Sequence, residues 1–283
     1  FPEALKMLAA RAGIILQHED PRVRSERNRL YDIGEAAAVE FEQVLSRTPA
    51  AREYLGTRGL SDETIANFRI GFAPDSWDFL LRSLAKKGFR GDELERAGLA
   101  LRPENRASWH DRFRSRIMFP IADASGRVIG FGGRILDALA APRTNADGTQ
   151  IVAEVQRNSA PGPRDSAAAP AAKYINTPQT PIYDKSRALY GFDKAKQEIR
   201  SRNRVVVVEG YMDCVMSHQA GVKNTVAVSG TALTRQQLTM LKRLCSVMVS
   251  SFDTDEAGQS ATRHSLALAA QFDFERLVVA IPS

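Results

Sequence analysis

Over residues 203–283 the chain alternates short β-branched runs with helical stretches, and this pattern limits the possible folds more than any other feature. Strands are predicted at 205–208, 225–228, 247–252 and 277–281. Helices are predicted at 211–219, 234–244 and 258–271. Because strands and helices that alternate at this spacing form right-handed βαβ units, we expect an α/β domain with a mainly parallel sheet.

The preceding residues mix helical and strand patterns without this alternation. Apolar residues recur at helical spacing over 4–16 and 30–45. Two apolar runs, 117–121 and 127–135, are joined by Asp-Ala-Ser-Gly, a turn sequence that predicts a β-hairpin. The segment 139–172 is rich in Ala, Pro, Asn and Gly without periodicity, so we expect a flexible insertion there.

These patterns predict two structural parts. Residues 1–202, which include the insertion, form a mixed α+β subdomain, and residues 203–283 form the α/β domain. Trp77 and Trp109 are expected in the core, with stacking on nucleic-acid bases as the alternative.

Composition excludes several classes of protein. The 283 residues carry 39 basic and 33 acidic side chains, and the resulting net charge of +6 is compatible with a polyanionic partner. Two cysteines are too few for a disulfide scaffold or a cysteine-built zinc site, and they fit a reducing compartment. No run of about 18 apolar residues could span a membrane, so we expect a cytoplasmic protein without membrane partners.

Acidic side chains stand where predicted parallel strands end. Glu209 follows the strand 205–208, and Asp213 lies four residues later on the same face of the next helix. Asp253 and Asp255 follow the strand 247–252. If these strands are neighbours, the carboxylates converge and need a hard cation, Mg²⁺ or Mn²⁺ rather than zinc. The alternative is that these acids only end strands and cap helices.

Basic residues concentrate in two stretches. Residues 102–134 hold seven Arg and three acids, and residues 164–204 hold nine Lys or Arg and four acids. Arg114 and Arg116 alternate with apolar residues, so we expect them on one face of a strand. Arginines presented in this way suit phosphate contacts. The alternative is a solvated face with surface ion pairs.

Three motifs together resemble the Toprim domain of bacterial DNA primases. They are Glu-Gly-Tyr-Met-Asp at 209–213, Gly-Thr-Ala-Leu-Thr at 230–234 and Asp-Thr-Asp-Glu-Ala-Gly at 253–258. Upstream, the residues at 111–121, 126–134 and 173–178 look like the RNA polymerase core of the same DnaG-type family. The resemblance covers nearly everything except 139–172. It implies an α+β N-terminal subdomain followed by a Toprim-type, Rossmann-like sheet, truncated at its C-terminal end.

The resemblance also implies a function in DNA replication. Members of this family synthesise short RNA primers on a single-stranded DNA template from ribonucleoside triphosphates. In this chain Glu209 would bind metal or act as the general base, Asp253 and Asp255 would hold Mg²⁺ or Mn²⁺, and Asp213 would support them. For the full-length protein the resemblance implies a replicative helicase and a single-strand-binding protein as partners. Zinc is implied only for the family's N-terminal domain, which has no counterpart here.

The family pattern also selects the basic and polar residues that would contact DNA or nucleotide. These are Arg114, Arg116, Lys173, Lys185 and Arg187, helped by Asn176 and Tyr211. The active site is expected in the cleft between the two parts of the chain.

Two departures from the family pattern stand out. Thr254 replaces the usual glycine between the two aspartates, and the family's last acidic motif would follow Ser283. We therefore expect weak or no activity from these residues alone. Two alternatives stay open: a Toprim-type nuclease or topoisomerase, and a catalytically incomplete fragment that only binds single-stranded DNA.

Overall fold

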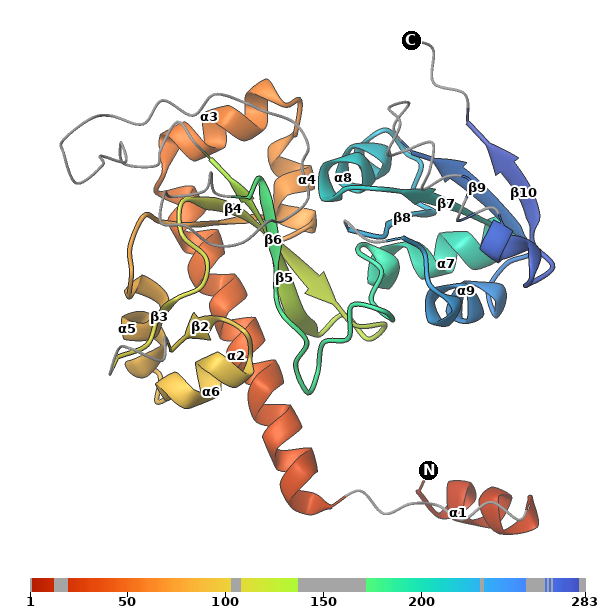
Figure 1. The fold of residues 1–283 in the computed structure, drawn as a ribbon, viewed down its shortest axis with the longest axis horizontal. Coiled ribbons are helices and arrows are strands. Elements are labelled where there is room, and N and C mark those ends of the chain that lie inside the picture. The colour runs from red at the N-terminus through yellow and green to blue at the C-terminus, as the bar shows by residue number, and fades with distance from the viewer. Residues whose placement is uncertain are drawn as a thin grey trace, which may run out of the picture.

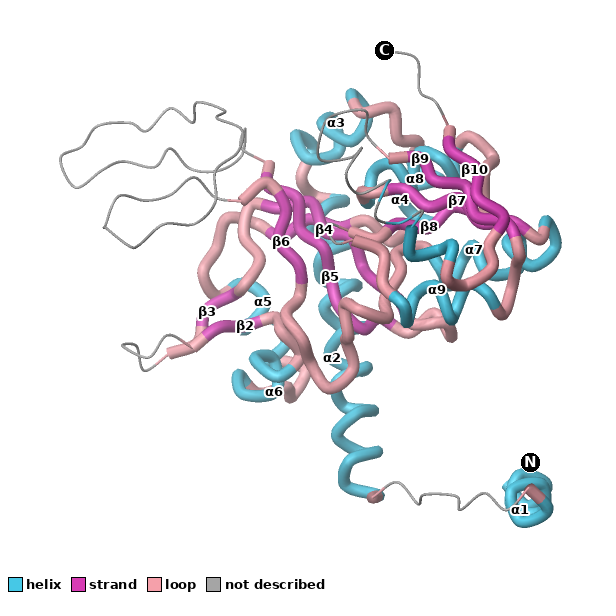
Figure 2. Tube along the Cα trace, turned by 45° about the vertical axis from the view of Figure 1, so that its right-hand side comes forward, coloured by secondary structure: helices cyan, strands magenta, loops and turns pink. Residues whose placement is uncertain are grey.

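The computed structural model describes most of the chain and contains helices and two main sheets that lie side by side (Figures 1 and 2). The described residues are 2–12, 20–102, 108–136, 172–229, 232–252, 263, 265 and 267–279. The predicted mixed helix-and-sheet fold class is confirmed. Most of the predicted insertion, residues 139–171, lies outside the described residues.

The first main sheet is antiparallel and has the order β1-β4-β5-β6. Its strands are β1 (Gly71–Ala73), β4 (Arg116–Ala122), β5 (Val128–Ile135) and β6 (Tyr174–Asn176). The predicted hairpin is confirmed as β4 and β5, which pair with Phe119 opposite Gly132. Asp123 closes its turn, because the Asp123 carboxylate accepts hydrogen bonds from the backbone N–H groups of Ser125 and Arg127.

A long helix, α2 (Pro21–Ser46), packs against β1 and β5. It begins earlier than the predicted 30–45, because Asp20 caps its first turn by accepting from the Arg22 N–H and Pro21 suits the first helical position. A shorter helix, α1 (Pro2–Arg11), precedes it. None of the helices in the described ranges has both the length and the apolar character needed to cross a membrane.

Smaller elements surround the antiparallel sheet. They are α3 (Pro49–Thr57), α4 (Asp62–Asn67), α5 (Phe79–Ala85), α6 (Gly91–Arg96), β2 (Ala100–Leu101) and β3 (His110–Asp111). Trp109 donates a hydrogen bond to Glu95 and packs on Gly91, in agreement with a mainly structural role. Trp77, by contrast, is 56% exposed, so its prediction as a core residue is wrong.

The second main sheet is parallel, as predicted, and has the order β10-β9-β7-β8. Its strands are β7 (Arg204–Val208), β8 (Thr225–Ala227), β9 (Val247–Ser251) and β10 (Glu275–Val278). The helices are α7 (Phe192–Arg202), α8 (Tyr211–Gln219) and α9 (Arg235–Lys242). The predicted helix 258–271 lies partly outside the described residues. Although α7 precedes residue 203, it packs against β7 and β8.

A cluster of aromatic rings joins the two sheets. Tyr211, at the start of α8, stacks on Phe119 of β4 with 5.1 Å between ring centroids and meets Tyr190 edge-on at 4.8 Å. A Cβ atom on Gly132 would lie 2.2 Å from the Tyr211 ring, so only glycine lets β5 approach this closely. The start of α8 is therefore fixed against the antiparallel sheet.

Candidate active site

Glu209 and Asp213 lie where β7 ends and α8 begins. Glu209 directly follows β7, and Gly210 is the N-cap of α8. The Asp213 carboxylate accepts a hydrogen bond from the Gly210 N–H at 3.0 Å, the capping arrangement expected of an acid at this helix position. Asp213 therefore holds the turn that carries Glu209.

The predicted acidic cluster requires that the two strands before Glu209 and Asp253 be neighbours in the sheet. Strands β7 and β9 are parallel neighbours, and Val208 pairs with Ser251. The chain therefore leaves both strands at the same sheet edge, with Glu209 and Phe252 as the next residues. Asp253 and Asp255 lie outside the described residues. Within the described ranges, no group of three or more acidic, His or Cys side chains could hold a metal ion.

A cavity of about 660 Å³ opens at this sheet edge, between the parallel sheet and β6. Its lining includes most of the described residues that sequence reasoning selected: Lys173, Asn176, Lys185, Glu209, Tyr211 and Asp213. Two lysines from one part of the chain and two carboxylates from the other thus share one cavity. This juxtaposition could neutralise a ligand that carries both phosphates and a metal ion.

Asn176 and Tyr211 connect the walls of this cavity. The Tyr211 hydroxyl donates to Asn176 Oδ1 at 2.7 Å, and Asn176 Nδ2 donates to the Ser229 carbonyl at 3.1 Å. Tyr211 is 2% exposed, and burial raises the pKa of its hydroxyl well above the ordinary value. It is therefore a neutral phenol at physiological pH, and these two residues fix β6 against α8 and the end of β8.

Arg114 and Arg116 do not share a strand face, so that prediction is wrong. Strand β4 begins only at Arg116, and Ser115 before it has a φ of 49°, which turns the backbone out of strand geometry. Arg116 is 6% exposed, and its Nη1 donates to the carbonyls of Gly133 and Ala172 at 3.1 and 3.0 Å. Its guanidinium therefore holds the sheet edge together rather than facing a solvated phosphate.

Arg114 is not among the residues that line the cavity. Its guanidinium carbon is 3.3 Å from the ring centroid of Trp77, which itself packs edge-on against His110. Because Trp77 is largely exposed, this pair presents a cation and an aromatic ring together.

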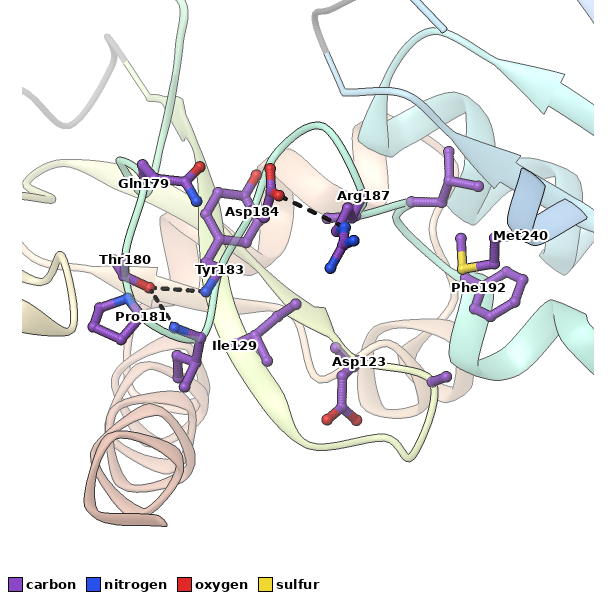
Figure 3. A pocket seen from close by; sticks show the side chains of 15 residues that line it. Asp123, Ile129, Gln179, Thr180, Pro181, Tyr183, Asp184, Arg187, Phe192 and Met240 are labelled. Atoms are coloured by element: carbon purple, nitrogen blue, oxygen red, sulfur yellow. Dashed lines mark hydrogen bonds and ion pairs between the residues drawn. The ribbon is translucent and has the colours of Figure 1, made fainter. Parts of the chain in front are cut away.

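Arg187 lines a second cavity, of about 420 Å³ (Figure 3). In that view Arg187 lies between Asp184 and Met240, and its guanidinium is 3.9 Å from the Asp184 carboxylate. Lys185 and Arg187 therefore line different cavities, although they belong to the same turn. Gln179 lines both cavities, so the segment 179–188 forms a wall between them.

Three arginines near the cavity were not singled out from the sequence. Arg112 donates to the Asn176 carbonyl through Nε and Nη2, and burial lowers the pKa of its guanidinium. Arg134 lies over the rings of Tyr54 and Tyr174, at 5.0 and 5.9 Å, and Arg58 lies over Tyr54. The arginine-rich stretch 102–134 contains two of the three, but no spacing rule distinguishes them.

The described donors agree in kind with a divalent hard cation. Glu209 and Asp213 offer carboxylate oxygens, and no His or Cys occurs among the described residues that line this cavity. Glu209 is the described residue best placed to hold such an ion, because it lines the cavity and directly follows the end of β7.

Comparisons with known proteins agree with this geometry. Residues 40–196 match the family described as the N-terminal domain of the DNA primase catalytic core, and residues 206–283 match the Toprim-like family. A DNA primase of Deinococcus radiodurans is 39% identical over 285 residues, which cover 100% of this chain and 44% of that relative. The chain thus spans less than half the length of this curated relative.

Two solved structures show the same fold. The RNA polymerase domain of the Mycobacterium tuberculosis primase DnaG has a TM-score of 0.73 and 34% identity, covering 90% of this chain and 76% of that chain. A DnaG primase catalytic domain bound to ssDNA has a TM-score of 0.72 and 34% identity, covering 92% and 73%. The two family matches imply use of a divalent metal ion in general. Since the first family match alone spans more than half of the residues, the chain belongs to the family of DNA primase catalytic cores.

Proposed function

We propose that this chain is the catalytic core of a primase that synthesises short RNA primers on single-stranded DNA by metal-dependent nucleotidyl transfer. One observation carries the proposal: Glu209 and Asp213 share a cavity with Lys173 and Lys185 at the edge where the parallel strands β7 and β9 end. The relatives named DNA primase, and the similar catalytic domain bound to ssDNA, support it.

Each residue has a distinct role in this proposal. Glu209 would hold Mg²⁺ or Mn²⁺ together with Asp253 and Asp255, and Asp213 would keep the Gly210 turn in place. When bound, the metal neutralises charge that develops on the reacting phosphate. Lys173 and Lys185 would bind the phosphates of the incoming ribonucleoside triphosphate. Their cationic Nζ groups suit this task, because phosphoryl transfer depends mainly on positioning and charge neutralisation.

The template strand would approach over the basic and aromatic residues outside the cavity. Arg58 and Arg134 flank Tyr54 next to the cavity wall, and Arg114 stacks on the exposed Trp77. Guanidinium groups bind backbone phosphates, and aromatic rings stack on unpaired bases. The full-length protein would act at the replication fork of a bacterial cell, with a replicative helicase and a single-strand-binding protein as partners.

A primer-synthesis assay with Glu209→Gln tests the proposal. Labelled ribonucleoside triphosphates and a single-stranded template are given to the full-length protein with Mg²⁺ or Mn²⁺. The variant should lose synthesis by at least about 100-fold, while its affinity for single-stranded DNA changes by less than about twofold. Glu53→Gln, at an exposed helix position, is the matched control and should keep full synthesis.

The products also separate the alternatives. RNA products that depend on Glu209 support a primase, and a cut template would identify a nuclease. Bound DNA with neither product would identify a binding fragment. Normal synthesis by the Glu209→Gln protein would refute the assignment.

A second assay tests the template path. Arg114→Ala should weaken single-stranded DNA binding and reduce the slope of log K against log salt by about 0.7, as expected for one lost phosphate contact. An unchanged slope would remove Arg114 from the template surface.

A further inference from the structure

The segment 184–188 carries Lys185 and separates the two cavities. Hydrogen bonds between its own residues hold its backbone. The Asp184 carboxylate accepts from the Ser186 N–H at 2.9 Å and from the Ser186 hydroxyl at 2.7 Å. The Ala188 N–H donates to the Asp184 carbonyl at 2.9 Å. These bonds form a tight turn, but they do not fix where the turn lies relative to Glu209.

Side chains at the start of α9 also form hydrogen bonds with this turn. Gln237 Nε2 donates to the Ala188 carbonyl at 2.7 Å and to the Lys185 carbonyl at 3.4 Å. Thr234 Oγ1 donates to the Ser186 carbonyl at 2.5 Å. Two side chains from the start of one helix thus contact three backbone carbonyls of the Lys185 turn.

Gln237 is buried, and its side-chain amide forms hydrogen bonds both with the N-cap of α9 and with the Lys185 turn. The side chain is 0% exposed. Its Oε1 accepts from the Thr234 N–H at 3.0 Å and completes the capping box of α9, while its Nε2 reaches the Lys185 turn. A carboxylate could perform the capping but could not donate to a carbonyl. The neutral amide of Gln237 satisfies both sides.

We propose that Gln237 is a positioning residue of the candidate active site: its amide fixes the backbone of the Lys185 turn, and so the reach of Lys185 toward the triphosphate. This role rests on the proposed function of Lys185. The neighbouring Leu238 and Leu241 are buried in the core, so α9 is a rigid support for the turn. Because phosphoryl transfer depends on positioning, a displaced Lys185 should weaken substrate binding even though Gln237 touches no substrate.

Gln237→Glu separates the two tasks of the amide. It keeps the oxygen that accepts from Thr234, and in its ionised form it replaces the donor with an oxygen that faces the Ala188 carbonyl. In the full-length protein we expect the KM for ribonucleoside triphosphates to rise about tenfold, with kcat changed by less than about threefold. Thr239→Val, which alters an exposed hydroxyl of the same helix, is the control and should change neither constant.

A double-mutant cycle shows whether Gln237 acts through Lys185. Lys185→Ala alone should also raise the KM, and adding Gln237→Glu should then raise it by less than about twofold further. Multiplicative effects would overturn the proposal, because Gln237 would then act independently of Lys185. If Gln237→Glu does not fold, Gln237→Met, which lacks both donor and acceptor, takes its place in the same cycle.

Amide hydrogen exchange gives a readout that does not depend on activity. In the Gln237→Glu protein the amides of Arg187 and Ala188 should exchange faster, while the amide of Leu241 inside α9 should not. Unchanged exchange at the turn would overturn the proposal even if synthesis falls. Faster exchange without any effect of Lys185→Ala on the KM would instead refute the proposed role of Lys185 and leave the contact purely structural.

Discussion

Two regions of the molecule are rich in charged side chains, and they use those charges in opposite ways. At the end of β7, Glu209 and Asp213 face a cavity together with Lys173 and Lys185. At the start of β4, by contrast, Arg116 points inward and donates to backbone carbonyls.

The difference follows from backbone geometry rather than from charge. Residues that follow parallel strands leave the sheet at its edge, where no neighbouring strand covers them. The strand β4, in contrast, lies between β1 and β5, and Arg116 at its start donates to Gly133 of β5 and to Ala172 just before β6. Position relative to the sheet therefore decides whether a charged side chain can meet a ligand.

The largest expected effect concerns the two lysines of the cavity. The double variant Lys173→Ala, Lys185→Ala should weaken binding of ribonucleoside triphosphates by about 100-fold, because two charge-assisted contacts are lost. Its urea unfolding midpoint should stay close to that of the unaltered protein. A large loss of stability with unchanged nucleotide binding would show that the lysines, like Arg116, are structural.

Gly132→Ala should perturb the junction of the two sheets. The added Cβ would overlap the Tyr211 ring, so the ring or β5 must shift, and we expect a loss of about 2 kcal/mol of unfolding free energy. Equilibrium unfolding in urea measures this loss. The corresponding change at Gly126, in the β4–β5 turn with open space around it, tests backbone strain without a clash. Equal losses at both positions would argue against close packing as the cause.

Arg116→Met should act on stability rather than on binding. The substitution leaves the carbonyls of Gly133 and Ala172 without this donor, at a cost of about 1.5 kcal/mol. In the folded variant, affinity for single-stranded DNA should remain within about twofold of the original. A strong drop in DNA affinity and salt slope would place Arg116 on the DNA-binding surface instead.

The remaining effect, spread over a range of pH, is a dependence of stability on pH from Asp111. Burial raises the pKa of this carboxyl to about 6, although it accepts from the N–H groups of Leu80 and Leu81. Since this value exceeds the unfolded one, protonated Asp111 stabilises the fold below about pH 4, and this stabilisation is lost as the pH rises through about 6.

Asp111→Asn removes this titration and provides the comparison. Between about pH 4 and 6, the free energy of unfolding of the original protein, relative to the variant, should fall by up to about 1 kcal/mol per pH unit. A constant difference over that range would mean that Asp111 is ionised throughout.

The sequence predicted best what depends on local pattern. The β-branched run that became β7, the capping box at Thr234 and the turn before β5 all follow from a few neighbouring residues. The placement of Glu209 at the edge where β7 and β9 both end could also be anticipated, because strand ends of a parallel sheet meet at one edge.

Features that depend on single backbone angles or on distant packing could not be predicted. The positive φ of Ser115 separates Arg114 from Arg116, and nothing in the alternation of charged and apolar residues signals it. Trp77 is exposed, and its backbone is held by a contact distant in sequence, in which the Asp111 N–H donates to the Trp77 carbonyl. Likewise, Asn176 is a plausible polar contact in sequence, but its amide is bonded to Tyr211 and Ser229.

The claim that Glu209 holds a metal ion is tested most directly by crystals of the full-length protein soaked in Mn²⁺. Anomalous diffraction should show a peak within about 2.5 Å of a Glu209 carboxylate oxygen, and the peak should be absent from crystals of Glu209→Gln. A Mn²⁺ peak bound elsewhere, with none at Glu209, would contradict the proposed active site.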